Sequence, residues 1–437
     1  MRSFLKGHDK KSHSHHNEQE NYDNIDDVDE VDDGNRNIIL AIITQLRPGA
    51  DLSRITLPTF ILERKSMLER ITNLMQHPQE LIRAAEASTP EARFVEVVRW
   101  YMAGWHIAPK AVKKPLNPIL GEYFSCWWDL EDGTQAYYVA EQTSHHPPKS
   151  SYFYIIPEHG IRADGLLLPY SRFLGNSAAS IMEGIGYLMF ENHDEAYSIT
   201  QPNIYARNIL LGSLKLEMGD HAIVECKKTG MKLDIEFKVK GFISGTWHAV
   251  EGTITKNGQT LYEITGKWNE VLNIKDLRTG KSEVFFDATK DRGVPPKVRP
   301  ISEQGEHESR RLWRHVTDAL GNRDHNTATT EKAKIEDEQR ALRSERSHGI
   351  IPEHHDRLFK PIDGNLQYII GIDELLKKTP PEKRGELLRK YVPILPGDKF
   401  PEDFSKPVSE KVANLASGST SSEPAEDDEF VDAEETI

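Results

Sequence analysis

The segment Tyr137-Tyr-Val-Ala-Glu-Gln-Thr-Ser-His-His-Pro-Pro-Lys-Ser-Ser-Tyr-Phe-Tyr-Ile-Ile156 sets the expected fold of this chain. Two aromatic-rich runs, typical of strands, flank the pair His145-His146 and two prolines. Each proline fixes its own φ, and Pro147 also pushes His146 towards an extended conformation. Two imidazoles on a stiff backbone suit an anion such as phosphate at least as well as a metal. The alternatives are a strand end with two satisfied histidines and a catalytic pair.

The same texture extends over residues 119–290. Short alternating or aromatic-rich runs are separated by Gly, Asn and Asp, and Lys256-Asn-Gly-Gln259 is typical of a hairpin turn. Many consecutive strands without alternating helices predict a large antiparallel sheet or barrel. A closed barrel of this size should enclose a ligand cavity.

Helical patterns precede and follow the β-rich region. They predict helices over residues 38–46, 63–76, 90–105, 306–319, 330–346 and 381–391. The first is apolar on nearly every side, which is typical of a helix that sits in a core or covers an apolar site. On the fifth, Lys332, Glu336 and Arg340 share one face, and this spacing alone predicts a solvated ladder of ion pairs.

The formal net charge of −14 belongs to the ends of the chain. Residues 1–36 carry five bases and ten acids, and residues 418–437 carry eight acids and no base, which leaves 50 bases and 51 acids between them. This balance argues against a nucleic-acid-binding protein. The two cysteines fit a reducing compartment. Without a secretory signal or an apolar run of membrane-spanning length, we expect a cytosolic protein with peripheral membrane contact.

Four stretches resemble conserved blocks of the oxysterol-binding-protein-related lipid-transfer family. Glu141–Pro148 is similar to the family signature, and the others agree in order and spacing: Lys113–Glu122, Gly266–Trp268 and Lys332–Arg340. The resemblance covers roughly residues 37–400. Within the family, Leu57–Leu62 and Tyr170–Gly175 are most similar to the fungal subgroup that carries phosphatidylserine.

The resemblance implies an α+β fold. Its centre is a large incomplete antiparallel β-barrel that encloses a lipid tunnel, with an N-terminal lid and flanking helices. We therefore divide the chain into an acidic tail (1–36), a lid segment (37–62), a lipid-binding domain (63–410) and a second acidic tail (411–437). Both tails have the composition of disordered segments.

The resemblance also implies two sets of binding residues. Those expected to bind phosphatidylinositol 4-phosphate are His145, His146, Lys114, Asn117, Lys332, Glu336 and Arg340. The histidines are expected on the 4-phosphate, Lys114 and Asn117 at the tunnel entrance, and the three residues of the predicted helix on the inositol side, with Arg340 also reaching phosphate. Those expected to bind phosphatidylserine are Leu57, Thr59, Asn117 and Ser171. The chemistry fits, because Arg and Lys pair with phosphate and a carboxylate accepts hydrogen bonds from inositol hydroxyls. No metal, cofactor or catalytic residue is implied.

The implied function is the exchange of phosphatidylserine for phosphatidylinositol 4-phosphate between the endoplasmic reticulum and the plasma membrane, by a protein peripheral at their contact sites. A sterol in place of phosphatidylserine, or a lipid sensor without net transfer, are the alternatives. A hydrolase using Ser144 and His145 is disfavoured, because adjacent residues in an extended segment point to opposite faces. The chain also lacks a Gly-x-Ser-x-Gly elbow.

The last residues carry a separate motif. Glu429-Phe-Val-Asp-Ala-Glu-Glu435 resembles the FFAT motif, which docks on VAP receptors of the endoplasmic reticulum, and only Val431 departs from the specified positions. The expected docking residues are Glu429, Phe430, Asp432, Ala433 and Glu435, with Phe430 and Ala433 in the receptor pocket. The acids that precede the motif would steer the tail towards a basic surface.

Overall fold

The computed structural model describes residues 47–50, 58–107, 113–209, 214–241, 245–365, 367–404 and 406–410. The expected helix over 38–46, Leu57, both acidic tails and the docking motif lie outside the described residues, so the proposed division of the chain stays a prediction. Within the described part, no helix combines the length and apolarity needed to cross a bilayer.

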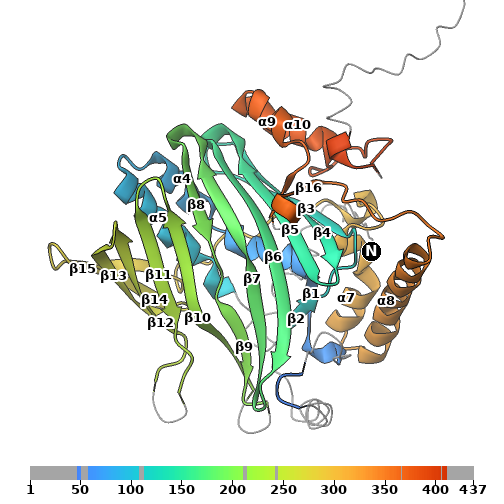
Figure 1. Cartoon of the computed structure of the whole chain (residues 1–437), viewed down its shortest axis with the longest axis horizontal. Coiled ribbons are helices and arrows are strands. Elements are labelled where there is room, and N and C mark those ends of the chain that lie inside the picture. The colour runs from blue at the N-terminus through green and yellow to red at the C-terminus, as the bar shows by residue number, and fades with distance from the viewer. Residues whose placement is uncertain are drawn as a thin grey trace, which may run out of the picture.

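Thirteen antiparallel strands form one sheet, which dominates the molecule (Figure 1). They are β3 (Tyr123–Asp129), β4 (Gln135–His145), β5 (Pro148–Ile156), β6 (Ile161–Phe173), β7 (Ser177–Phe190), β8 (Glu195–Ile199), β9 (Asn203–Arg207), β10 (Lys215–Cys226), β11 (Met231–Phe237), β12 (Ala249–Lys256), β13 (Gln259–Lys267), β14 (Val271–Asp276) and β15 (Ser282–Asp287). The path runs in chain order from β3 to β8 and from β10 to β15, with β9 beside β7 and β10. No pairing between described residues joins β3 to β15, so the predicted incomplete barrel is confirmed.

The predicted turn between β12 and β13 is also confirmed. Lys256 pairs with Gln259, and the two residues between them, Asn257 and Gly258, have φ values of 48° and 84°. A two-residue hairpin turn of the primed type requires positive φ at both positions, which asparagine and glycine adopt most readily.

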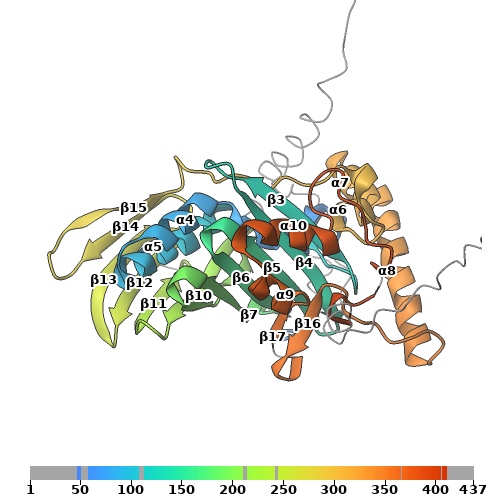
Figure 2. The same ribbon diagram turned by 90° about the horizontal axis from the view of Figure 1, so that it is seen from above.

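Two helices cover one face of the sheet, as seen from above in Figure 2. They are α4 (Pro78–Glu86) and α5 (Pro90–Ala103), and the latter confirms the helix predicted at 90–105. Thr89 caps α5, since its side chain accepts a hydrogen bond of 3.1 Å from the Ala92 amide. The apolar side of α5 packs with inward side chains of the strands in the main hydrophobic core. A cavity of about 20 Å³ lies in this core beside Trp100, Tyr101 and Tyr152.

C-terminal elements cover the opposite face of β3 to β6. These are β16 (Phe359–Ile362), β17 (Gln367–Ile370), α9 (Asp373–Lys378) and α10 (Pro381–Tyr391). Their apolar side chains form a second core with Tyr137, Val139 and Phe153, whereas Tyr138 and Ala140 belong to the main core. These strands are therefore buried on both faces, which explains their nearly continuous apolar and aromatic runs.

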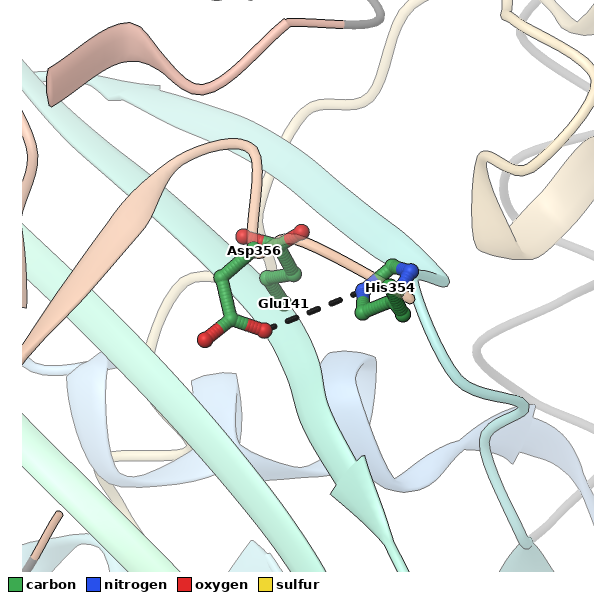
Figure 3. A group of neighbouring side chains, drawn as sticks. All are labelled: Glu141, His354 and Asp356. Atoms are coloured by element: carbon green, nitrogen blue, oxygen red, sulfur yellow. Dashed lines mark ion pairs between the residues drawn. The ribbon is translucent and has the colours of Figure 1, made fainter. Parts of the chain in front are cut away.

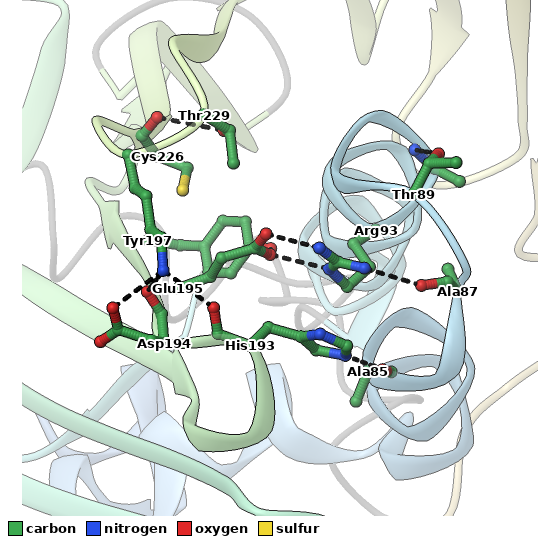
Figure 4. Close-up of polar contacts among 12 residues, drawn as sticks. Ala85, Ala87, Thr89, Arg93, His193, Asp194, Glu195, Tyr197, Cys226 and Thr229 are labelled. Carbon is green, nitrogen blue, oxygen red and sulfur yellow. Dashed lines mark hydrogen bonds and ion pairs between the residues drawn. The ribbon is translucent and has the colours of Figure 1, made fainter.

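A buried ion pair joins the helical layer to the sheet (Figure 4). Arg93 on α5 donates two hydrogen bonds, of 2.9 and 2.6 Å, to the two carboxylate oxygens of Glu195 on β8. The Tyr197 hydroxyl donates to the same carboxylate, and Arg93 also donates to the Ala87 carbonyl. Since the side chains of Arg93 and Glu195 are only 7% and 3% exposed, this pair is shielded from water.

The prediction of one continuous helix over residues 63–76 is wrong, because only residues 67–75 are helical. The segment begins with β1 (Leu62–Ser66), which pairs in parallel with β2 (Lys114–Leu116), and only then forms α3 (Met67–Arg70) and a 3₁₀ turn (Ile71–Met75). The amphipathic pattern is compatible with a helix, but pairing with a strand distant in sequence overrides this local preference.

The helices expected after the sheet are present with different bounds. The first is divided into α6 (Ser309–Leu312) and α7 (Arg314–Gly321), and α8 (His325–Ser347) begins earlier than predicted. Asp324 explains this earlier start, because its carboxylate accepts a hydrogen bond from the Thr327 amide as an N-cap. Helix α8 stands beside the end of β4 in both views (Figures 1 and 2).

Candidate functional site

The two histidines of the signature occupy the turn between β4 and β5. His145 pairs with Pro148 across the hairpin, and the His146–Pro147 peptide bond is cis. The two imidazole rings meet edge to face, with their centroids 4.6 Å apart. His145 is half-buried and His146 is exposed, so the pair presents both rings at the end of a well-paired hairpin.

One hydrogen bond fixes the orientation of His145. Its Nδ1 lies 2.9 Å from the carbonyl oxygen of Pro118, which can only accept, so Nδ1 carries the proton. Burial lowers the pKa of His145, and the charges of His146 and Arg343 act in the same direction, whereas the Pro118 carbonyl and Glu336 act to raise it. The ring is therefore neutral near pH 7, and its Nε2 can accept a hydrogen bond or take up a proton.

Helix α8 supplies the opposite side of the candidate site. Lys332 donates a hydrogen bond to Glu336, and Glu336 in turn acts electrostatically on His145. Arg340 instead pairs with Asp337, and its side chain is 65% exposed. Glu336 therefore acts on His145 with Lys332 bonded to it, while the guanidinium of Arg340 pairs with a neighbour on its own helix.

The segment 114–118 contributes a third group of residues to the candidate site, next to His145. Lys114 is half-buried on β2, and Asn117 is exposed after the end of that strand. Both are close in sequence to Pro118, whose carbonyl holds His145. This connection places the predicted entrance residues on the segment that fixes the imidazole.

The residues predicted to bind the serine headgroup lie next to one apolar cluster. Thr59 is buried, with its hydroxyl 3.3 Å from the His325 carbonyl at the start of α8. The next residue, Phe60, packs in a cluster with Phe173 at the end of β6. Ser171, two residues before Phe173, is half-buried. Thr59 and Ser171 therefore lie next to the contact between Phe60, just before β1, and Phe173 of the sheet.

Two buried carboxylates of the conserved blocks serve the architecture, a role the sequence pattern did not indicate. Glu122 accepts hydrogen bonds from Ser66, Ser309 and the Trp313 indole, so it joins β1, β3 and α6. Burial raises its pKa, and these donors oppose that shift. Gly121, beside it, has a φ of +77°, and a Cβ there would lie 2.8 Å from the ring of His354.

Glu141, the first residue of the signature, anchors the chain that leads to β16. Its two oxygens accept hydrogen bonds of 2.8 Å from the backbone amides of Arg357 and Leu358. This carboxylate lies on the strand that ends at His145. Strand β4 therefore carries both the first histidine of the hairpin and the carboxylate that holds the C-terminal elements in place.

Glu141, His354 and Asp356 form a group of side chains of the types that can bind a metal (Figure 3). Their ligand atoms lie within 4.8 Å of one another, with His354 Nε2 3.7 Å from Asp356 Oδ1. Burial together with the positive charges of Arg346 and Arg357 lowers the pKa of His354 to about 4. These charges oppose a cation, and Glu141 already accepts two amide hydrogen bonds. The group therefore fits a structural junction better than a metal site.

Comparison with known proteins gives consistent matches over most of the chain. The family model for oxysterol-binding protein matches residues 41–319. The chain is 53% identical over 386 residues to oxysterol-binding protein-like protein OBPa of Candida albicans, covering 86% of this chain and 89% of that protein. It is 51% identical over 395 residues to oxysterol-binding protein homolog 6 of Saccharomyces cerevisiae, covering 87% and 86%.

Solved structures share the fold at lower identity. The Osh1 ORD domain in complex with cholesterol matches with a TM-score of 0.66 and 23% identity, covering 79% of this chain and 88% of that one. The Osh3 ORD in complex with PI(4)P, from Saccharomyces cerevisiae, matches with a TM-score of 0.61 and 21% identity, covering 83% and 94%. At these identities the likeness establishes the fold alone.

Proposed function

Because this chain belongs to the oxysterol-binding protein family, we propose that it exchanges phosphatidylserine for phosphatidylinositol 4-phosphate between the endoplasmic reticulum and the plasma membrane. The observation that carries the proposal is the histidine hairpin beside α8, with the centroids of the two imidazole rings 4.6 Å apart and His145 held by the Pro118 carbonyl. The PI(4)P complex of the Osh3 domain, which has the same fold, supports it. One tunnel would hold either lipid, so a gradient of one could drive the other without a cofactor.

We assign the headgroup contacts as follows. The 4-phosphate lies at His145 and His146, with Lys114 and Asn117 at the entrance. Lys332, Glu336 and Arg340 lie towards the inositol, and Arg340 also reaches phosphate. The serine headgroup lies at Thr59, Asn117 and Ser171, and Leu57, outside the described residues, lies along an acyl chain. This assignment gives the two lipids overlapping sites, which is what makes them exclude each other.

A liposome transfer assay tests the exchange. Labelled phosphatidylserine starts in donor liposomes, and acceptor liposomes contain phosphatidylinositol 4-phosphate or unphosphorylated phosphatidylinositol. We expect the first acceptors to accelerate phosphatidylserine transfer and to lose phosphatidylinositol 4-phosphate to the donors, because each lipid displaces the other from one site. Equal rates with both acceptors would refute exchange.

A sterol is the second candidate cargo, since the Osh1 domain with the same fold binds cholesterol. The same assay with labelled sterol decides between the cargoes by their relative rates. Binding of phosphatidylinositol 4-phosphate without transfer of any second lipid would instead favour a lipid sensor.

We also propose that the C-terminal tail docks on a VAP receptor, which would keep the cytoplasmic protein at membrane contact sites. The predicted contacts are Glu429, Phe430, Asp432, Ala433 and Glu435. Full-length protein with Phe430→Ala and Asp432→Ala should lose about 10-fold or more in receptor binding, as expected when a pocket anchor is truncated. The control Thr436→Ala lies beyond the motif and should bind like wild type. Retained binding by the double variant in a pull-down would contradict the docking.

A further inference from the structure

The two cations of α8 assigned to the candidate phosphate site are both paired with carboxylates of that helix. A phosphate monoester carries about −1.5 to −2 charge near pH 7. Lys332 is paired with Glu336, and Arg340 is paired with Asp337. His145 is held neutral, mainly by its burial. Each predicted cation on α8 is therefore matched by a carboxylate of the same helix, so an arginine without such a partner would add fixed positive charge for a phosphate.

Arg343 on α8 is placed to supply such a positive charge. Seven residues span almost two helical turns, so Arg343 lies within about 20° of Glu336 around the helix axis. Arg340, four residues after Glu336, lies about 40° away on the other side. Helix α8 stands beside β4, the strand that ends at His145 (Figures 1 and 2), and the charges of Glu336 and Arg343 both act on the imidazole of His145. The stripe of α8 on the side of the histidine pair therefore continues from Glu336 to Arg343.

Arg343 is also available for a ligand. Its side chain is exposed, and it makes no hydrogen bond or ion pair with the residues that the structure describes. A guanidinium presents two parallel N–H groups to phosphate oxygens and stays protonated at any physiological pH. It can therefore supply fixed positive charge without breaking an existing pair.

We propose that Arg343 is a further phosphate-binding residue, which contacts the 4-phosphate beside His145 and His146 and favours phosphatidylinositol 4-phosphate over lipids that lack this group. The inference rests on the proposed function and adds the residue that supplies the unmatched charge. Phosphatidylserine, which lacks the 4-phosphate, gains nothing from Arg343. The residue thus affects the choice of lipid more than lipid binding in general.

The test measures extraction by the full-length protein from phosphatidylcholine liposomes that contain phosphatidylinositol 4-phosphate, phosphatidylinositol or phosphatidylserine. Arg343→Ala should weaken binding of the first lipid about 10-fold, the size expected for one charge-assisted hydrogen bond, and leave phosphatidylserine binding unchanged. Arg343→Lys keeps the charge but not the fork, so it should restore part of the loss. The control is Lys334→Ala, since Lys334 is 65% exposed on the same helix and pairs with Glu331.

The outcomes separate this inference from the proposed function. Normal phosphatidylinositol 4-phosphate extraction by Arg343→Ala, or an equal loss in Lys334→Ala, overturns the role of Arg343 alone. An equal loss of phosphatidylserine binding in Arg343→Ala overturns it as well, because the residue would then be structural. A wild-type protein that extracts no phosphatidylinositol 4-phosphate overturns the proposed function and this inference with it.

Discussion

Replacing His145 and His146 together by alanine is expected to weaken phosphatidylinositol 4-phosphate binding by roughly 100-fold or more, because two hydrogen bonds to one phosphate are lost. The bond from His145 forms when its Nε2 takes up a proton beside the phosphate. The rings lie 4.6 Å apart, close enough to contact the same phosphate, and the Pro118 carbonyl holds His145 in orientation. Phosphatidylserine binding should persist, because its proposed contacts lie on other segments. Mass spectrometry of lipids extracted by both proteins from mixed liposomes measures the two effects at once.

A matched control comes from another histidine on a strand. His221 on β10 is exposed and pairs with Asp234, far in sequence from the hairpin, so His221→Ala should extract both lipids like wild type. Equal loss of both lipids in the double variant would mean that the histidines hold the hairpin together. Normal extraction of phosphatidylinositol 4-phosphate by the double variant would show that the two histidines do not bind this lipid.

The side chains that face the histidine pair were predicted from the sequence only in part. The i, i+4, i+8 spacing of Lys332, Glu336 and Arg340 correctly indicates one helix face, but it cannot decide between side-chain partners. Arg340 has a carboxylate at i−3 as well as at i−4, and it takes Asp337. Arg343 belongs to the same face, but it lies seven residues after Glu336. A pattern with a spacing of four residues therefore does not include it.

The fold was predictable where alternation and turns are local. The Asn257-Gly258 turn and the aromatic-rich strands β4 and β5 follow from a few neighbouring residues. The strand at 62–66 was missed because its partner, β2, lies about fifty residues further along the chain. The role of Glu141 was also inaccessible, since its amide partners are separated from it by 216 and 217 positions. Such contacts depend on the tertiary arrangement rather than on local spacing.

Arg93→Met is expected to lower the free energy of unfolding by about 3–5 kcal/mol, because it leaves the buried Glu195 carboxylate without its guanidinium. Burial acts to raise the pKa of Glu195, and the hydrogen bonds from Arg93 and Tyr197 outweigh it, so the pKa is lowered in the intact protein. Without Arg93, the Tyr197 hydroxyl still donates to the carboxylate, but no guanidinium pairs with it. Urea denaturation of the full-length chain, followed by tryptophan fluorescence, measures the change.

The control for this substitution is Arg278→Met, which removes an arginine that pairs with Glu91 of the same helix. The Arg278 side chain is 43% exposed, and exposed ion pairs contribute little, so its loss should change stability far less. Equal losses of unfolding free energy in the two variants would show that burial does not make the Arg93–Glu195 pair more important for stability than an exposed pair.

The double variant Arg93→Met/Glu195→Gln separates the pair from its surroundings. Removing both charges also removes the uncompensated carboxylate, so the double variant should be more stable than the sum of the single effects predicts. Additive effects would instead assign the loss to packing around α5. Because α5 packs with the strands in the main hydrophobic core, loss of the Arg93 pair should impair binding of both lipids together with stability. The histidine substitutions should affect one lipid only, and this difference distinguishes a residue that maintains the fold from one that recognises a headgroup.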